Sequence, residues 1–491
     1  MARPVLPPPP LQDVGLFDPR VSMEYAEPTG PDLTALRGPA GPASGFGPSG
    51  HRQPAARIEW PLVVTLRSRA SAEITEQSER AATDGRPLSE QDQRLLGRAV
   101  IRRVVRAHVD QLSADGAALW SIDHEEAYAA AVESAIFGYG RLQPLIELDD
   151  VENIEIHGCD SVVIQRGDGS RYVHPPVADT DEELVEAVRF LGERNRPSRP
   201  FDDAHPTVTL ALGERFRLHA IGFGLSYRPS VTIRRHNLVD IGLPDLVNAG
   251  MLPEQVGRYL YAAVRARKSI VVSGDQGAGK TTLLRALIAA IPDSERFGTI
   301  ETDYELLTHL QPNRRNILAL QARVGQGERQ DGRPIGEVTV ADLIPEALRQ
   351  NLSRLVVGEV RGAEAAAMFE AMQTGAGSLS TTHSHSSSAT MDRLASRVAQ
   401  GGTLGIDEAY RQIAHNIDLL VHVTLVDDTW RGGVRRRYVS EIRELTGAIE
   451  GSRPVTHLTF LAEADGVNEP GFRPDPRTAR ELSRYLAGWR A

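Results

Sequence analysis

Residues 274–281 read Gly274-Asp275-Gln276-Gly277-Ala278-Gly279-Lys280-Thr281, which is the pattern G-x-x-x-x-G-K-[ST] of a phosphate-binding loop. Lysine occurs at only one other position, Lys268, among the 55 lysines and arginines of the chain. The chain therefore keeps a compact ammonium group in this loop although it uses arginine almost everywhere else. A crowded loop that wraps around β- and γ-phosphates requires such a group.

The segments on either side of this loop predict a strand and a helix. Residues 270–272 are Ile-Val-Val, typical of a short buried strand, and residues 281–291 form an apolar helical pattern that stops at Pro292. Backbone N–H groups of the loop and the positive end of the helix would then converge on phosphate. We therefore expect Gly274 through Thr282 to bind a nucleotide.

The composition argues against nucleic acid as a direct partner. The formal net charge is −10 and aromatic residues make up 5% of the chain, which leaves little positive charge for a phosphate backbone and few rings for base stacking. Cys159 is the only cysteine, which fits a reducing cytoplasm. No apolar stretch approaches the roughly 20 residues that span a bilayer, so we expect a cytoplasmic protein held at a membrane only through partners.

Shifts in composition and periodicity divide the chain into five segments. Residues 1–56 are rich in Pro, Gly, Ser and Ala, and we expect them to be disordered. Helical spacing of apolar residues predicts a helical segment over 57–141, and short β-like runs predict a smaller α+β N-terminal domain over 142–236. Strands and helices alternate over 237–445, which predicts an α/β ATPase domain, and 446–491 is a C-terminal extension.

The alternating segment determines the fold class. Alternation of this kind produces a mostly parallel sheet with helices on both faces and a ligand at the carboxyl ends of the strands. The last two β-like runs, 419–426 and 438–445, are expected to form an antiparallel hairpin. A hinge between the two domains is predicted between His236 and Pro253, where Asn, Gly and Pro residues gather.

Two carboxylates stand at the ends of predicted neighbouring strands. Glu359 follows the apolar run 355–358, and Glu301 follows the run 297–300. Carboxylates in these places can hold Mg²⁺ or orient the water that attacks a nucleotide. Both are therefore candidate catalytic residues, and either assignment fits the sequence. Thr281 and Glu359 are the expected metal ligands.

His383 ends another strand, in the run Gly377-Ser378-Leu379-Ser380-Thr381-Thr382-His383. We expect it to contact the γ-phosphate, and a surface histidine in a serine-rich loop is the alternative. His383 and His385 alone do not predict zinc, because a zinc site needs further clustered ligands. Four arginines are candidates to neutralise phosphate as arginine fingers, with surface ion pairs as the alternative: Arg217, Arg234, Arg323 and Arg349.

Taken together, these motifs resemble the type II/type IV secretion traffic ATPases, and most closely the branch that drives tight-adherence (Flp-type) pilus assembly. The resemblance covers roughly residues 130–445. The matching segments are residues 273–282, Thr299-Ile300-Glu301 with Glu305-Leu306, Gly336 to Thr339, LVVGEVRG at 355–362 and GSLSTTH at 377–383, with Phe137 to Leu145 upstream.

The resemblance implies a RecA-like P-loop ATPase that uses ATP and Mg²⁺ and assembles as a homohexameric ring. Each nucleotide would lie between the ATPase domain and the N-terminal domain, whose Arg217 and Arg234 would reach toward phosphate. The partner would be an inner-membrane platform protein of a pilus or secretion system, at the cytoplasmic side of the membrane.

Two other functions stay open at this point. One is a conjugation-type motor that serves DNA or effector export. The other is a nucleotide-gated scaffold that binds ATP and scarcely hydrolyses it. The second is motivated by two departures from the family pattern, Thr302 where an aspartate usually follows Glu301, and Asn351-Leu352 where Arg-Pro usually stands.

Overall fold

The structure of the protein is a computed structural model that describes residues 58–491 apart from 118–119, 196–197, 238, 312–313, 331, 361, 363, 375–376, 403, 463–470 and 490–491. The disorder predicted for residues 1–56 lies outside the described residues. Residues 58–491 pack as one unit.

Three helices begin the described chain, as the apolar spacing predicts. Ser89 and Ser121 stand at the N-termini of the second and third helix, where each hydroxyl accepts a hydrogen bond from a backbone N–H three residues on. Valine, leucine and tyrosine side chains of all three helices share one small core. The helices are α1 (Trp60–Thr83), α2 (Glu90–Ala114) and α3 (Ile122–Phe137).

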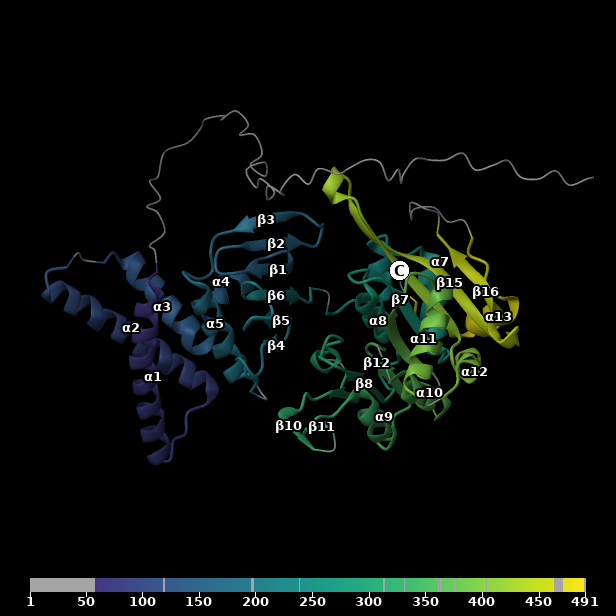
Figure 1. The fold of residues 1–491 in the computed structure, drawn as a ribbon, viewed down its shortest axis with the longest axis horizontal. Coiled ribbons are helices and arrows are strands. Elements are labelled where there is room, and N and C mark those ends of the chain that lie inside the picture. The colour runs from purple at the N-terminus through teal and green to yellow at the C-terminus, as the bar shows by residue number, and fades with distance from the viewer. Residues whose placement is uncertain are drawn as a thin grey trace, which may run out of the picture. The chain divides into compact units, whose positions relative to one another are not determined.

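A six-stranded antiparallel sheet follows, with the strand order β3-β2-β1-β6-β5-β4 (Figure 1). Helix α5 (Asp181–Arg194) packs its apolar face on this sheet through Leu184, Val188 and Leu191. The sequence reading missed β3, a short edge strand. The strands are β1 (Val151–His157), β2 (Val162–Arg166), β3 (Arg171–His174), β4 (Thr207–Leu212), β5 (Phe216–Ile221) and β6 (Ser230–Arg235).

The larger sheet has eight strands in the order β16-β15-β14-β7-β13-β12-β8-β9. The six strands from β14 to β9 run parallel, and the predicted hairpin of β14 and β15 is antiparallel. The mostly parallel sheet is therefore confirmed. Strand β16, within the segment 446–491, extends it. The strands are β7 (Ile270–Gly274), β8 (Phe297–Glu301), β9 (Ile317–Gln321), β12 (Arg354–Val357), β13 (Leu379–His383), β14 (Leu419–Asp427), β15 (Arg435–Glu450) and β16 (Arg453–Leu461).

Helices cover both faces of this sheet because its central strands are apolar on both sides. In β7, Ile270 and Val272 belong to one core and Val271 to the other. The first core holds α6 (Leu243–Asn248), α7 (Glu254–Arg265) and α8 (Lys280–Ala289); the second holds α9 (Val340–Leu348), α10 (Glu364–Thr374), α11 (Ser387–Gln400) and α12 (Ile406–Asn416). The remaining elements are α4 (Gln143–Ile146), the hairpin β10 (Gln326–Gln330) and β11 (Arg333–Ile335), and α13 (Pro476–Leu482).

The hinge predicted between His236 and Pro253 is wrong in its second half. Helix α6 lies inside that stretch, and its Leu243 and Leu246 side chains are buried in the core of the eight-stranded sheet. The Gly and Pro residues there cap and begin a helix, a role that composition alone does not distinguish from a flexible connection.

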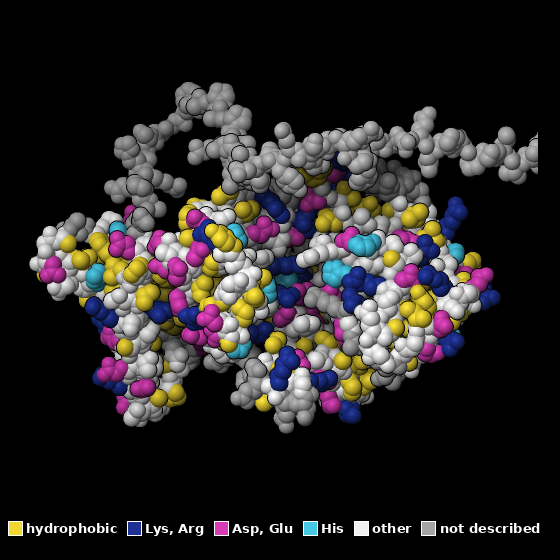
Figure 2. Space-filling view, in the orientation of Figure 1, with side chains coloured by type: hydrophobic (Ala, Val, Ile, Leu, Met, Phe, Trp, Pro, Cys, Tyr) yellow, Lys and Arg dark blue, Asp and Glu magenta, His cyan; other side chains and the backbone are white. Residues whose placement is uncertain are grey.

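No helix within the described residues is both long and apolar enough to cross a membrane. Acidic and basic side chains are interspersed on the face drawn in Figure 2, as on ordinary protein surfaces.

A buried ion pair joins the start of β12 to two neighbouring segments. The Arg354 side chain is fully buried, and its guanidinium donates hydrogen bonds to the Glu295 carboxylate at 3.0 and 3.2 Å and to the Val264 carbonyl, at the end of α7, at 3.0 Å. Removal of one member of such a pair leaves the other charge buried without its partner.

We predict that Arg354→Met lowers the free energy of unfolding by about 3–5 kcal/mol, measured by urea denaturation. The double variant Arg354→Met/Glu295→Gln should recover part of this loss, because no buried charge is then left behind. Arg349→Met, which removes an arginine from an exposed pair with Glu346, is the control and should stay near wild type. Equal losses in Arg354→Met and the control would contradict the prediction.

Candidate functional site

The glycine loop lies between β7 and α8, at the carboxyl end of a central strand of the parallel sheet. Gly279 adopts φ +97° immediately before α8, a conformation that L side chains rarely adopt. At Gly274 a Cβ atom would lie 2.3 Å from the carbonyl oxygen of Val423 in β14. The two glycines are therefore required by backbone conformation and by the close approach of a neighbouring strand.

Lys280 is buried at the N-terminus of α8, with 7% of its surface exposed. Its ammonium donates to the carbonyl oxygens of Gly274 and Asp275, at 3.1 and 2.8 Å, and to Nδ1 of His383 at 3.1 Å. An ammonium group has three N–H donors and no acceptor. These three contacts therefore match its three donors and place its charge inside the loop.

His383 connects the loop to Glu359. Strand β13 lies between β7 and β12, with His383 opposite Gly274 in the register. Because Lys280 can only donate, Nδ1 of His383 accepts, and the proton of a neutral imidazole is then on Nε2. Nε2 lies 2.9 Å from the Glu359 carboxylate. The structure thus brings three predicted residues, Lys280, His383 and Glu359, into one chain of polar contacts at the carboxyl ends of three adjacent strands.

A polar cavity lies beside this chain. Glu359, Glu301 and Thr281 are among the residues that line it, together with Arg217 of β5 in the other sheet. The Oε2 atom of Glu301 is buried and has no hydrogen-bond partner among the described residues. Mg²⁺ in nucleotide sites is held through one or two carboxylates together with substrate phosphates. The donor set fits such an ion, with Thr281 and Glu359 nearest to the loop.

Glu301 is almost completely buried, and its other oxygen accepts the backbone N–H groups of Glu305 and Leu306 at 2.9 and 2.7 Å. Burial raises the pKa of Glu301 to about 8, although the two backbone hydrogen bonds act in the opposite direction. Glu301 therefore holds a proton at neutral pH in this structure. It organises the turn that carries the acidic residues Asp303 and Glu305.

Arg217 binds that acidic turn directly. Its guanidinium is 2.7 Å from the Asp303 carboxylate and 2.6 Å from that of Glu305. Arg234 stands opposite Arg217 in the register of β5 and β6. Burial would raise the pKa of Glu305, but the charges of Arg217, Arg234 and His236 lower it overall. In this structure Arg217, a predicted phosphate-binding arginine, is thus engaged by carboxylates of the acidic turn.

The other histidine and arginine candidates lie elsewhere. Arg349 forms an exposed ion pair with Glu346 on α9, and Arg323 donates to the carbonyl of Gly336. His385 contacts the Asp275 carboxylate, at 2.9 Å, on the exposed side of the loop. None of these three candidates is among the residues that line the cavity.

Sequence reasoning missed one side chain that touches the loop. Arg437 of β15 donates its Nε–H to the carbonyl oxygen of Gly277 at 2.8 Å. The only trace of it in the sequence is the arginine run at 435–437. The register of β15 decides which of these three consecutive arginines reaches the loop, and the sequence alone does not give that register.

The fold and this site define a P-loop nucleotide hydrolase. The family model described as "Type II/IV secretion system protein" matches residues 179–433. The chain belongs to this family and is an ATPase.

Two relatives and one solved structure are similar to parts of this chain. A putative conjugal transfer protein of Mycobacterium tuberculosis is 32% identical over 329 residues, which cover 65% of this chain and 87% of that protein. The type IV secretion system protein VirB11 of Brucella suis is 26% identical over 61% of this chain and 88% of its own length. A crystal structure of the Brucella suis VirB11 ATPase with sulphate aligns over 65% of this chain and 96% of that chain, at 24% identity and a TM-score of 0.32.

The raised pKa of Glu301 predicts a pH dependence of stability. An ordinary glutamate has a pKa of 4.5. Because the folded protein binds this proton more tightly than the unfolded chain, the contribution of Glu301 to stability is fully present below about pH 4.5 and is lost as the pH rises through about 8. Glu301→Gln cannot titrate and keeps an oxygen for the two backbone N–H groups.

We therefore expect the wild-type melting temperature to fall more between pH 5 and 9 than that of Glu301→Gln, both without nucleotide and Mg²⁺. Thermal unfolding followed by circular dichroism measures the difference. Parallel pH profiles for the two proteins would contradict the raised pKa.

Proposed function

We propose that this chain is a Mg²⁺-dependent ATP-hydrolysing motor that works as a homohexamer and powers pilus assembly or protein secretion through an inner-membrane platform protein. The observation that carries the proposal is the chain of contacts from Lys280, which is hydrogen-bonded to His383, to Glu359, whose carboxylate lies 2.9 Å from the His383 imidazole. This chain of contacts connects Lys280, which would balance phosphate charge, to Glu359, which lines the cavity. Binding of a phosphate in the loop would therefore change the contacts of Glu359.

In the proposed site, residues 274–282 bind the phosphates of ATP. Thr281 and Glu359 would hold Mg²⁺, which neutralises charge that develops on the phosphate oxygens. Glu359 is the better candidate for a charged role, because Glu301 is protonated at neutral pH and is tied to the backbone of its own turn. We propose that His383, which contacts Lys280 in this structure, exchanges that contact for one to the γ-phosphate.

Arg217 would act as a movable positive group. Asp303 and Glu305 hold it in the present arrangement, and a triphosphate beside Thr281 would offer it a competing anion. We propose that Arg217, together with Arg234, joins the nucleotide when the N-terminal domain (142–236) and the ATPase domain (237–445) move toward each other. The tight-adherence branch is supported by the LVVGEVRG and GSLSTTH segments.

Two alternatives have specific support. A conjugation-type export motor is favoured by the 32% identity to a protein described as a putative conjugal transfer protein. A nucleotide-gated scaffold with little turnover is favoured by Thr302, which lines the cavity and offers a hydroxyl where a carboxylate usually stands. In each case we place the chain in the cytoplasm, at the inner membrane through its partners and without direct contact to nucleic acid.

Lys280→Ala tests the loop assignment. We expect ATP turnover to fall by at least roughly 100-fold, because a preorganised charge that faces the phosphates is removed. A coupled assay of ADP release measures it. Lys268→Ala is the matched control, since it removes the only other lysine of the sequence. Lys268 lies two residues before β7 begins, away from the phosphate loop, and pairs with Asp418 and Glu481. Turnover near the wild-type rate in Lys280→Ala would refute the loop as the active site.

Glu359→Gln should keep ATP bound and lose hydrolysis, because the amide preserves shape and removes the negative charge. Filter binding measures retained nucleotide, and light scattering of the ATP-bound variant gives its mass. A mass six times that of the chain supports the motor. If the wild-type protein hydrolyses ATP at its full rate as a monomer, the ring is ruled out. If the wild-type protein binds ATP and does not hydrolyse it, the scaffold is established.

A further inference from the structure

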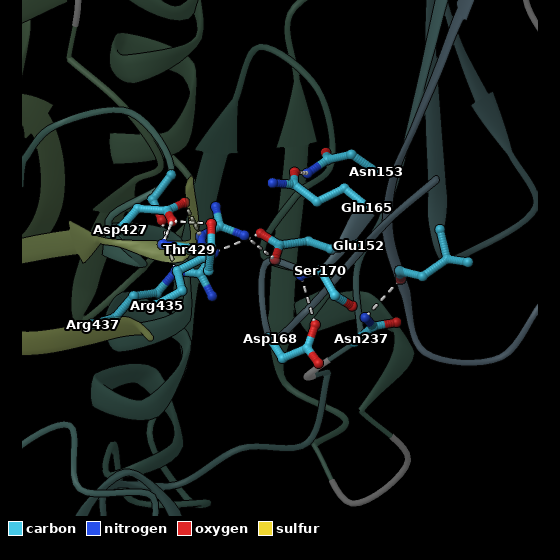
Figure 3. Close-up of polar contacts among 12 residues, drawn as sticks. Glu152, Asn153, Gln165, Asp168, Ser170, Asn237, Asp427, Thr429, Arg435 and Arg437 are labelled. Carbon is cyan, nitrogen blue, oxygen red and sulfur yellow. Dashed lines mark hydrogen bonds and ion pairs between the residues drawn. The ribbon is translucent and has the colours of Figure 1, made fainter. Parts of the chain in front are cut away.

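Three charged residues connect the six-stranded sheet to the edge of the phosphate loop (Figure 3). Glu152 of β1 accepts from Nη1 of Arg435 at 3.0 Å and from Nη2 of Arg437 at 2.7 Å, and both arginines belong to β15 of the other sheet. We call Glu152, Arg435 and Arg437 the Glu152 cluster. One carboxylate thus receives two charge-assisted hydrogen bonds, which are the stronger kind in proteins.

The same guanidinium of Arg437 continues to the loop. Its Nε–H donates to the carbonyl oxygen of Gly277, in the residue that has φ +76° at the centre of the loop. In a phosphate-binding loop the backbone N–H groups must face the ligand. A donor that holds a carbonyl oxygen from outside keeps that peptide unit turned so that N–H groups of the loop face inward. Arg437 is therefore suited to fix the loop in its binding conformation.

The cluster is largely removed from solvent. The side chains of Arg435, Glu152 and Arg437 are 7%, 16% and 25% exposed. Arg435 also lies 3.3 Å from the Asp427 carboxylate. Ion pairs exposed to water contribute little, whereas loss of one member of a buried group leaves its partners without compensation. The position of Arg437 therefore depends on Glu152.

The turn between β2 and β3 packs on Arg435 of the Glu152 cluster. A Cβ atom at Gly169 would lie 2.9 Å from Cδ of Arg435 and 3.0 Å from Cγ2 of Thr429. An added Cβ at this contact would therefore force Arg435 or the turn to shift. The six-stranded sheet thus contacts β15 in two ways. Glu152 forms ion pairs with Arg435 and Arg437, and Gly169 packs against Arg435.

We propose that the Glu152 cluster positions the phosphate loop, so that the six-stranded sheet regulates nucleotide affinity through Arg437. Arg437 is a positioning residue, because it acts on the backbone of the loop and not on the nucleotide. The inference deepens the proposed function and rests on it, since it takes the loop as the nucleotide site. Coupling of this kind is reciprocal, so bound nucleotide in turn stabilises the contact between the two sheets.

The first test is a double-mutant cycle in the full-length protein. Glu152→Gln and Arg437→Gln should each weaken ADP binding by about 10-fold, measured by calorimetry, and the double variant should be no weaker than the weaker single variant. The KM for ATP should rise in both single variants while kcat changes little. Glu155→Gln is the control on the same strand, because Glu155 pairs with Arg171 inside its own sheet at 3.4 Å.

The second test disturbs the contact without removing a charge. Gly169→Ala should weaken ADP binding in the same direction as Glu152→Gln. Gly224→Ala is its matched control, because Gly224 has a similar φ of +80°, against +89° at Gly169, but nothing within 4 Å of an added Cβ. The backbone strain is then similar in both variants, and only Gly169→Ala forces the sheet away from Arg435.

The outcomes separate this inference from the proposed function. If the wild type binds ADP and Lys280→Ala does not, the loop is the site. Additive losses in the cycle, or equal losses in Glu155→Gln and Glu152→Gln, then overturn the positioning role alone. Wild-type protein that binds no ADP overturns both proposals. Coupled losses together with wild-type affinity in Gly224→Ala support the inference.

Discussion

The ammonium group of Lys280 is the interaction around which this site is organised. A buried positive charge is tolerated only where dipoles or counter-charges surround it. Here two loop carbonyls and an imidazole nitrogen do so, and they come from β7, the loop and β13. The imidazole in turn fixes the position of Glu359 at the end of β12. Three strand ends are therefore aligned by one charge, and the sheet order β7-β13-β12 is what allows it.

Much of this arrangement is readable in the sequence because it obeys local rules. The Lys280 loop and Glu359 each follow an apolar run, His383 ends the β-like run 378–382, and the carboxyl ends of parallel strands meet at one edge. The sequence does not state which strands are neighbours, so the chain of contacts from Lys280 through His383 to Glu359 was not predicted. Strand β16 and helix α12 were missed, and neither adjoins a motif.

Other features depend on distances that a sequence does not contain. The protonation of Glu301 follows from its depth of burial. The sequence leaves open whether Glu301 or Glu359 carries the charged role, and only that depth distinguishes the two. Arg217 was predicted near phosphate and lies against Asp303 and Glu305. The two carboxylates of this turn offer Arg217 negative charge and hydrogen-bond acceptors, as a phosphate would, and the sequence does not show that they lie beside it. Arg437 reaches the loop through register alone.

The packing of α6 also has a mechanical consequence. Since Leu243 and Leu246 are anchored in the core of the eight-stranded sheet, the connection to β6 consists of residues 236–242 only. A fully extended chain advances at most about 3.6 Å per residue, so these residues span at most about 25 Å. This length limits the distance between the end of β6 and the start of α6. While the core that holds α6 stays intact, a subunit cannot separate its two sheets farther than this at that junction, however much free energy ATP hydrolysis releases.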